Sequence, residues 1–312
     1  MFDYNGPKTL SQILSERAGK PTTLNAAIEQ FLSDLLITDT LSDRAASRQQ
    51  SVRAAVEDRL KIPIDNSYLV GSYARNTQIS EILGQGIIDV DCLLILKQTK
   101  DVVAKYYSNT DGGARILNEL RDAINGYQGL RAEVSRPCVT LTWADMKMEM
   151  TPSFELRDGG YFIPSNEVWT FKWQETDPIK DGDLILARNK EFDGRFKHMV
   201  RMIKCWNRNF GKPFSSFGLE ALAYITTNGF RGLDVELPHF FRKLHDYIGY
   251  EVPAPSEVGS RVHLRFESYR KHYILTFAER IQRAFYLGSI GQHQEAIALM
   301  GSVFGKPFPG VK

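Results

Sequence analysis

The feature that most constrains this chain is an almost uninterrupted apolar run, Ile87–Lys97, which carries two aspartates near its start. A run of this length and composition predicts a strand buried in a sheet. Side chains two positions apart on a strand point to the same face, so Asp89 and Asp91 share one face while Val90 and Cys92 share the other. Neighbouring carboxylates in an apolar strand repel each other and are costly to desolvate, so the pattern calls for a positive charge beside them.

A Mg²⁺ ion is an economical source of that charge, because it binds one or two carboxylates together with phosphate oxygens and water. A solvated edge strand with two ordinary acids is the alternative, and the Asp-x-Asp pattern alone does not decide between them. The segment Ser67–Gly71 favours the ion: it is short, β-prone, and ends in a Gly71-Ser72 turn 18 residues before Asp89. Glycine permits close approach of the backbone, and the amide groups of such a turn, with the Ser72 hydroxyl, can hold a phosphate.

A third acid follows in the alternating segment Met146–Met150. Alternation places Lys147 and Glu149 on one face and the methionines on the core face. If this strand neighbours the Asp-x-Asp strand, Glu149 lies beside Asp89 and Asp91. Three carboxylates that hold two Mg²⁺ ions are the components for in-line attack of a hydroxyl on the α-phosphate of a nucleotide. An ordinary surface acid is the alternative for Glu149.

The remaining pattern predicts helices first, then a mixed α/β core, then a mostly helical half, with the boundary between residues 155 and 195. Either Thr40 or Ser42 is a candidate cap for the second helix. The break at Ala144-Asp145 is hairpin-like. The predicted elements are helices over 24–35, 42–60 and 112–126, strands over 67–71, 87–97, 139–143 and 146–154, a polar stretch over 157–193, and helices from 195 almost to the end.

Composition is that of an ordinary globular protein of 312 residues, with 43% hydrophobic and 24% charged residues. The sequence has neither a signal-peptide pattern at Met1–Lys20 nor an apolar run of about 20 residues, so we expect a protein without a membrane segment. Three widely spaced cysteines form neither a disulfide framework nor a zinc motif, which favours the cytoplasm. A net charge of +2 is too balanced for a general nucleic-acid binder, so any anionic partner must meet a local basic cluster.

One such cluster occupies residues 195–212, which hold six basic residues and no acid. Helical spacing places Lys197, Arg201, Lys204 and Arg208 on one face. Like charges four residues apart destabilise a helix unless an anion or facing acids offset them. A nucleoside triphosphate is one such anion, and a solvated charged face is the alternative.

Three motifs carry a resemblance to a known family. The segment 71–77, Gly-Ser-Tyr-Ala-Arg-Asn-Thr, resembles a GSY-x-x-x-T motif, and Glu149-Met-Thr-Pro-Ser resembles the strand that carries the third acid. Lys204-Cys-Trp206, followed by 215–220, resembles a K-x-W…S-[YF]-x-L-E helix pair. Over residues 40–310 the chain therefore resembles the DNA polymerase β-like nucleotidyltransferase superfamily and, within it, the bacterial cGAS/DncV-like nucleotidyltransferases (CD-NTases, SMODS type). It departs from the pattern in having Glu for the commoner Asp as third acid, and in the loop between Thr77 and Asp89.

The resemblance implies an α+β fold: a nucleotidyltransferase core with a small mixed sheet flanked by helices, a C-terminal helical domain, and an active site in the cleft between them. We expect the core in residues 1–190, including the N-terminal helices. Residues 191–312 would form a helical domain like that of the oligoadenylate synthases.

The resemblance also implies the roles of site residues. Asp89, Asp91 and Glu149 would be catalytic and would bind two Mg²⁺ ions, with Mn²⁺ as an alternative. The donor triphosphate would be held by Gly71, Ser72, Lys204 and Ser216. Phe217 is either a base-stacking ring or plain core, and Trp206 is core. Lys172 is a candidate donor to a base edge or an ordinary surface lysine.

The implied reaction joins ribonucleoside triphosphates into a cyclic di- or trinucleotide, a second messenger that acts through an effector protein in anti-phage (CBASS) signalling. The resemblance implies a cytoplasmic monomer that needs neither a membrane nor long DNA or RNA. Two alternatives differ in function: a transferase that adds nucleotides to RNA, tRNA or another acceptor, and a non-catalytic nucleotide-binding homologue. The bases, the linkage and the ring size are left open by the sequence.

Overall fold

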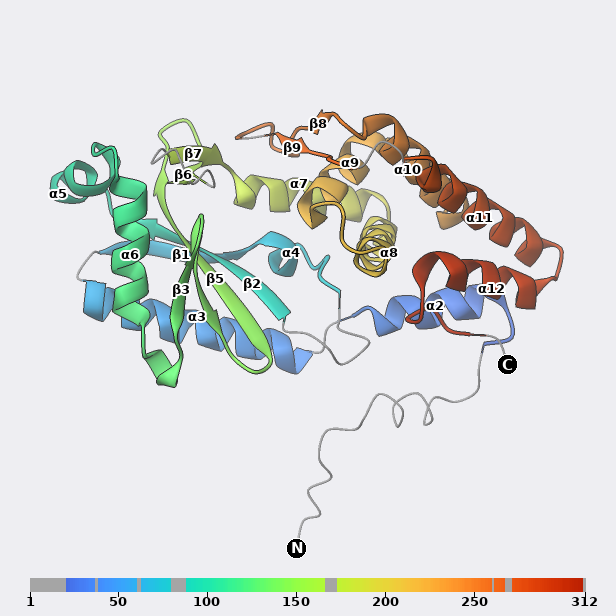
Figure 1. The fold of residues 1–312 in the computed structure, drawn as a ribbon, viewed down its shortest axis with the longest axis horizontal. Helices are drawn as coiled ribbons and strands as arrows, with labels where there is room; N and C mark the ends of the chain where they lie inside the picture. The colour runs from blue at the N-terminus through green and yellow to red at the C-terminus, as the bar shows by residue number, and fades with distance from the viewer. Residues whose placement is uncertain are drawn as a thin grey trace, which may run out of the picture.

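The computed structural model describes residues 21–36, 39–60, 63–79, 88–165, 173–259, 261–266 and 271–310. Figure 1 shows two parts side by side, a sheet with helices and a bundle of helices. The first part contains α3 (Asp39–Leu60), β1 (Ile64–Val70), α4 (Gly71–Ala74), β2 (Ile88–Leu96), α5 (Lys100–Val102) with the π-helical turn Val103–Tyr107, α6 (Gly112–Ile124), the 3₁₀ turn Tyr127–Gly129, β3 (Ala132–Ser135), β4 (Cys138–Thr142), β5 (Met146–Glu155), β6 (Tyr161–Pro164) and β7 (Trp173–Thr176). The second contains α2 (Leu24–Asp34), α7 (Pro178–Glu191), α8 (Arg195–Asn209), α9 (Ser216–Thr226), α10 (Leu233–Tyr247), β8 (Glu251–Val252), β9 (Val262–His263), α11 (His272–Ser289) and α12 (His293–Phe304).

The main sheet has the strand order β1-β2-β5-β4-β3, and β6 and β7 continue from β5. Strands β2 and β5 are parallel, whereas the other neighbouring strands are antiparallel. Parallel neighbours need a long crossover, which here contains α6, β3 and β4. The mixed sheet and its flanking helices confirm the predicted α+β fold.

The two faces of β2 serve different purposes. Val90, Cys92 and Leu94 face α3 and α6 in one buried apolar core. Leu93 and Ile95 are buried on the opposite face, where α7 packs. Asp89 and Asp91 share that second face at the start of the strand, as the alternation predicted.

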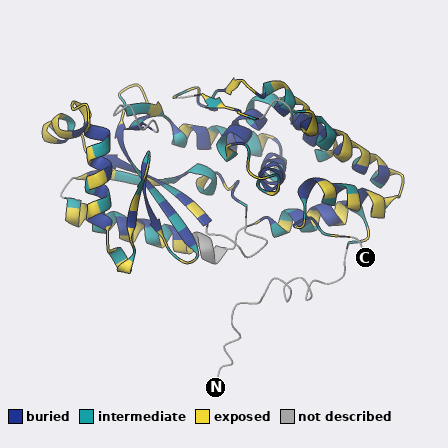
Figure 2. Cartoon of the chain, in the orientation of Figure 1, coloured by how far each residue is buried: buried dark blue, intermediate teal, exposed yellow. Residues whose placement is uncertain are grey.

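The helical part is built around α8, whose middle turns are buried on all sides (Figure 2). Trp206 is fully buried, and four phenylalanine rings lie around it with centroids 4.8 to 6.2 Å away. This confirms Trp206 as core. Helix α2 packs into the same core although it begins at Leu24, so the two ends of the described chain meet there (Figure 1).

Several sequence expectations meet a different structure. Helix α3 spans Asp39–Leu60, so Thr40 and Ser42 lie inside the helix and neither is the cap. The stretch predicted as polar contains β6, β7 and α7. The hairpin between β4 and β5 is confirmed. The division into two domains near residue 190 stays a prediction. Helix α2, which was expected in the nucleotidyltransferase core, packs instead with the C-terminal helices.

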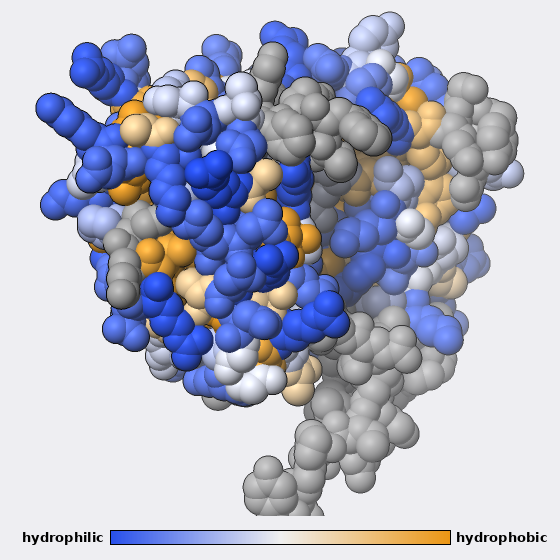
Figure 3. Space-filling model, turned by 60° about the vertical axis from the view of Figure 1, so that its left-hand side comes forward, coloured by the Kyte–Doolittle hydropathy of each residue, from blue (hydrophilic) through white to orange (hydrophobic). Residues whose placement is uncertain are grey.

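The surface agrees with a protein that keeps its apolar residues inside. Figure 3 shows mainly hydrophilic residues on the face that it presents, with small apolar areas between them. Among the described residues, no helix is both long enough and apolar enough to span a membrane.

Candidate active site

The Gly71-Ser72 turn lies directly against the second aspartate of β2. Gly71 begins α4 with φ +67°, a left-handed conformation that glycine adopts without strain. A Cβ atom at this position would lie 1.9 Å from Oδ2 of Asp91 and 3.0 Å from its Cβ. The backbone therefore approaches the aspartate so closely that only glycine fits.

The three predicted carboxylates come together because β5 lies next to β2. The parallel register pairs Asp89 with Lys147 and Asp91 with Glu149. All three carboxylates line one cavity of about 480 Å³, together with Gly71 and Ser72. The expectation that Glu149 neighbours the Asp-x-Asp pair is confirmed.

Burial, together with the charge of neighbouring carboxylates, raises the pKa of both aspartates of β2. Burial raises the pKa of Asp91 to about 6, and the charge of Glu149 adds to the rise, while Arg75 opposes it. Burial also raises the pKa of Asp89, against the opposing charge of Lys147. Ionisation of both aspartates is therefore costly at this position.

The donor set fits a hard divalent cation. Carboxylate oxygens are the ligands that Mg²⁺ and Mn²⁺ prefer. Over the described part of the chain, however, no three His, Cys, Asp or Glu side chains are already drawn together as a complete metal-binding group. The ammonium of Lys147 donates a hydrogen bond to Oε1 of Glu149 and lies 4.0 Å from Oδ1 of Asp89. The residues thus fit the ion by chemistry and charge rather than as a preformed cage.

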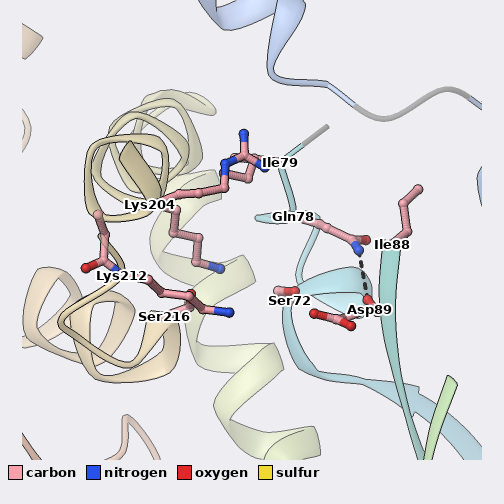
Figure 4. Close-up of a pocket in the computed structure, with 10 residues that line it drawn as sticks. Ser72, Gln78, Ile79, Ile88, Asp89, Lys204, Lys212 and Ser216 are labelled. Carbon is pink, nitrogen blue, oxygen red and sulfur yellow. Dashed lines mark hydrogen bonds between the residues drawn. The ribbon is translucent and has the colours of Figure 1, made fainter. Parts of the chain in front are cut away.

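The opposite wall of the cavity comes from the helical part. Lys204 of α8, Lys212 of the following loop, and Ser216 and Phe217 at the start of α9 all line it. Figure 4 shows Lys204, Lys212 and Ser216 facing Ser72 and Asp89 across an adjoining hollow of about 150 Å³. Phe217 is half-buried and is not part of the apolar core. Lys172 lies outside the described residues.

Lys204 is buried, and its ammonium already has partners. It donates to the hydroxyl of Thr77 at 3.0 Å and to the Thr77 carbonyl at 3.3 Å, and it lies 2.9 Å from Oε2 of Glu220. Arg75 donates two hydrogen bonds to the same carboxylate, at 2.9 and 3.1 Å. Burial opposes the ionisation of Glu220, but the charges of Lys204 and Arg75 outweigh it and lower its pKa to about 2.

At Arg201 and Lys204, the basic face of α8 is therefore neither a solvated surface nor a row of free cations. Arg201 and Lys204 are only 4% and 5% exposed. Arg201 donates to the carbonyl and side-chain oxygens of Asn76. The like charges of this face can be offset in two ways, by a bound anion or by facing acids, and the sequence left both open. For Lys204 the structure shows a facing acid, Glu220.

Sequence reasoning missed several residues at this site. Arg75 and Glu220 appeared only as letters of the motifs, without a role. Lys147 was placed on the correct face but without a partner, and Lys212 belonged to the basic cluster without a separate role. A buried glutamate in an otherwise apolar helix, as in α9, is the signal that a buried cation must face it.

The fit of Gly71 can be tested by Gly71→Ala with Gly129→Ala as a matched control. Gly129 also has a left-handed φ, +78°, but a Cβ there meets nothing within 4 Å. The control should lose about 1–2 kcal/mol of unfolding free energy. Gly71→Ala should lose about 1–3 kcal/mol more, because the methyl group overpacks against Asp91. Denaturant unfolding measures both losses, and equal losses would contradict the close approach.

Comparison with known families matches residues 22–189 to the Second Messenger Oligonucleotide or Dinucleotide Synthetase (SMODS) domain. The chain is similar to a probable cyclic nucleotide synthase of Bacillus cereus, with 26% identity over 277 residues, 77% of this chain and 81% of the relative. It is also similar to a cyclic AMP-AMP-AMP synthase of an Acinetobacter species, with 25% identity over 309 residues, 90% of this chain and 85% of the relative.

Two solved structures share the fold. The CD-NTase CdnG of Bradyrhizobium diazoefficiens, in complex with GTP, has a TM-score of 0.69 at 17% identity and covers 91% of this chain and 98% of its own. The DncV cyclic AMP-GMP synthase of Vibrio cholerae, in complex with a linear intermediate, has a TM-score of 0.66 at 13% identity, covering 90% and 97%. At these identities the likeness concerns the fold.

Proposed function

The chain belongs to the Second Messenger Oligonucleotide or Dinucleotide Synthetase family, and we propose that it condenses ribonucleoside triphosphates into a cyclic di- or trinucleotide with release of pyrophosphate. Membership makes it a nucleotidyltransferase of the cyclic nucleotide synthase class, and the resemblance to the CD-NTases is thereby confirmed. The observation that carries the proposal is the shared cavity. Three carboxylates on adjacent strands face it from one side, and cationic and hydroxyl side chains face it from the other.

In this proposal the donor triphosphate lies between the Gly71-Ser72 turn and the start of α9. Ser72 and the turn amides contact the phosphates. Ser216 is the first residue of α9, whose amides favour an anion, and Ser215 caps the helix by accepting a hydrogen bond from the Gly218 amide. Lys204 and the exposed Lys212 supply positive charge on the side where pyrophosphate leaves.

The carboxylates define the reacting end of the cavity. Asp89, Asp91 and Glu149 would hold two Mg²⁺ ions, or Mn²⁺ in their place, which supply Lewis-acid stabilisation of charge on the α-phosphate when bound. Glu149 completes the site on the acceptor side and helps to deprotonate the attacking ribose hydroxyl. Phe217 offers its ring to a base along the cavity wall.

Each condensation forms one phosphodiester bond between a ribose oxygen and an α-phosphorus and breaks the bond to pyrophosphate. Ring closure repeats this step within the linear product: the α-phosphate of the remaining triphosphate enters the ring, and its β- and γ-phosphates leave as pyrophosphate. A cyclic product therefore carries no terminal phosphate. Addition to RNA or another acceptor is the rival reaction, and it leaves a linear product.

Product analysis tests the proposal. We expect the pure protein, incubated with Mg²⁺ and labelled nucleoside triphosphates singly and in pairs, to form products that resist phosphatase and have the masses of cyclic di- or trinucleotides. ATP alone is the first reaction to run, because the Acinetobacter relative is a cyclic AMP-AMP-AMP synthase. Linear oligomers, or label transferred to added RNA, would favour the rival transferase, and no product under any pairing would contradict both.

The biological setting follows from the family as part of the same proposal. The cyclic nucleotide would serve as a second messenger that activates an effector protein in anti-phage (CBASS) signalling. The enzyme would work as a cytoplasmic monomer on free nucleotides, without long DNA or RNA. Size-exclusion chromatography with light scattering measures the oligomeric state, and a stable dimer would overturn the monomer assignment.

A further inference from the structure

A lysine lies among the carboxylates that we assign to metal. Alternation along β5 puts Lys147 on the same face as Glu149, and the parallel register puts it opposite Asp89. Its ammonium donates a hydrogen bond to Oε1 of Glu149 and lies 4.0 Å from Oδ1 of Asp89. The lysine thus contacts one carboxylate on each of the two strands.

Among the described residues, the other cations near the carboxylates form no ion pair with them, although their charges act on Asp89 and Asp91. Arg75 and Lys204 both bind Glu220 at 3.1 Å or less. Lys212 comes from the opposite wall and forms no ion pair within the described residues, so it acts on Asp89 only through its charge at a distance. Over the described part of the chain, Lys147 is therefore the cation in direct contact with the acidic cluster.

The position of Lys147 conflicts with that of a metal ion. A divalent cation bound by Asp89 and Glu149 would repel an ammonium at this distance and compete with it for the same oxygens.

We propose that Lys147 is a built-in counter-cation: it holds Asp89 and Glu149 in the metal-free enzyme and must be displaced when a divalent ion binds. The inference rests on the proposed metal site. Its consequence is that free metal binds more weakly than three carboxylates alone would allow. The triphosphate, which brings negative charge of its own, favours loading of the metal together with nucleotide.

Titration of the full chain with Mn²⁺ tests this without relying on activity. Free Mn²⁺ can be followed by its electron paramagnetic resonance signal, in the absence of nucleotide. Lys147→Met should bind Mn²⁺ about tenfold or more tightly than wild type, because one positive charge is removed from the site. Lys147→Gln should behave in the same way, and Lys147→Arg, which keeps the charge, should stay close to wild type.

The control is Lys105→Met, which removes a lysine paired with Glu119 on an exposed surface. It should leave Mn²⁺ binding unchanged. Thermal unfolding provides a second readout: with metal chelated, Lys147→Met should melt a few degrees below wild type, and saturating Mn²⁺ should raise its midpoint by more than it raises that of wild type.

The outcomes separate this inference from the proposed function. In one outcome, wild type binds Mn²⁺ and Asp91→Asn weakens the binding, but the neutral Lys147 variants bind no more tightly than wild type. This outcome contradicts the role of Lys147 as a counter-cation and leaves the proposed metal site intact. If wild type binds no Mn²⁺ with or without a triphosphate, the metal site itself fails.

Discussion

Asp91→Asn is expected to abolish nucleotide condensation while making the metal-free protein more stable. The loss of activity should be roughly a thousandfold or more, equal to about 4 kcal/mol, because a central ligand of the proposed metal site is removed. The gain in stability follows from the pKa of Asp91, which burial raises to about 6 from 3.8. A shift of about two units corresponds to at most about 3 kcal/mol.

The gain has a defined pH dependence. An acid whose folded pKa is raised binds more protons in the native state between its two pKa values, so its ionisation costs stability as pH rises from about 4 to about 6. Asp91→Asn removes this cost, and its advantage should be full above pH 6 and should vanish below pH 4. Chemical denaturation at several pH values, with metal chelated, measures it.

The control for Asp91→Asn is Asp65→Asn, at an exposed position of β1. It should leave both turnover and stability near wild type. Asp89→Asn should also abolish condensation, with a smaller gain in stability because Asp89 is more exposed. Retention of more than a few per cent of activity in both Asp89→Asn and Asp91→Asn would contradict the metal site.

The acidic half of the site could be predicted because the face to which each side chain of a strand points depends on local rules. The period of two along a strand decides that Asp89 and Asp91 share a face, and that Lys147 and Glu149 do so too. Whether the methionine-rich strand lies beside the Asp-x-Asp strand was left as a condition by the pattern, and the structure meets that condition. The register itself, which puts Lys147 rather than Glu149 opposite Asp89, is a tertiary property and could not be derived from the pattern.

The basic half was harder because it depends on contacts across the chain. Helical spacing placed Lys204 and Arg201 on one face correctly, but it could not show whether that face meets water, a ligand or protein. The answer lies in Thr77 and Asn76, more than 120 residues away in the sequence. The same limit applies to α2, whose amphipathic pattern predicts a helix but not that it packs against the C-terminal helices.

The buried carboxylate of Glu220 joins the two halves of the site. It receives hydrogen bonds from Arg75 and Thr77 of the segment that follows the Gly71-Ser72 turn, and it pairs with Lys204 of α8. All of these charged side chains are 5% exposed or less. The cluster therefore fixes the distance between the Gly71-Ser72 turn and the helical wall of the cavity.

Glu220→Gln should consequently destabilise the protein by about 3–5 kcal/mol, because it keeps the shape of the side chain but leaves two buried cations without a counter-charge. The lowering of the Glu220 pKa from 4.5 to about 2 corresponds to a stabilisation of similar size. This stabilisation is present above pH 4.5 and is lost as pH falls toward 2. Wild type should therefore lose stability in that acidic range more steeply than the variant. Glu119→Gln, which removes a partly exposed ion pair with Lys105, should cost less than about 1 kcal/mol.

A second substitution distinguishes charge imbalance from simple loss of a hydrogen bond. In the Glu220→Gln background, Lys204→Met removes one of the unpaired cations, so the double variant should recover part of the lost stability even though it has fewer polar contacts. Denaturant unfolding of the four proteins forms a double-mutant cycle, and the interaction energy should be large and favourable to the double variant. Additive losses would mean that the contribution of Lys204 to stability does not depend on the charge of Glu220.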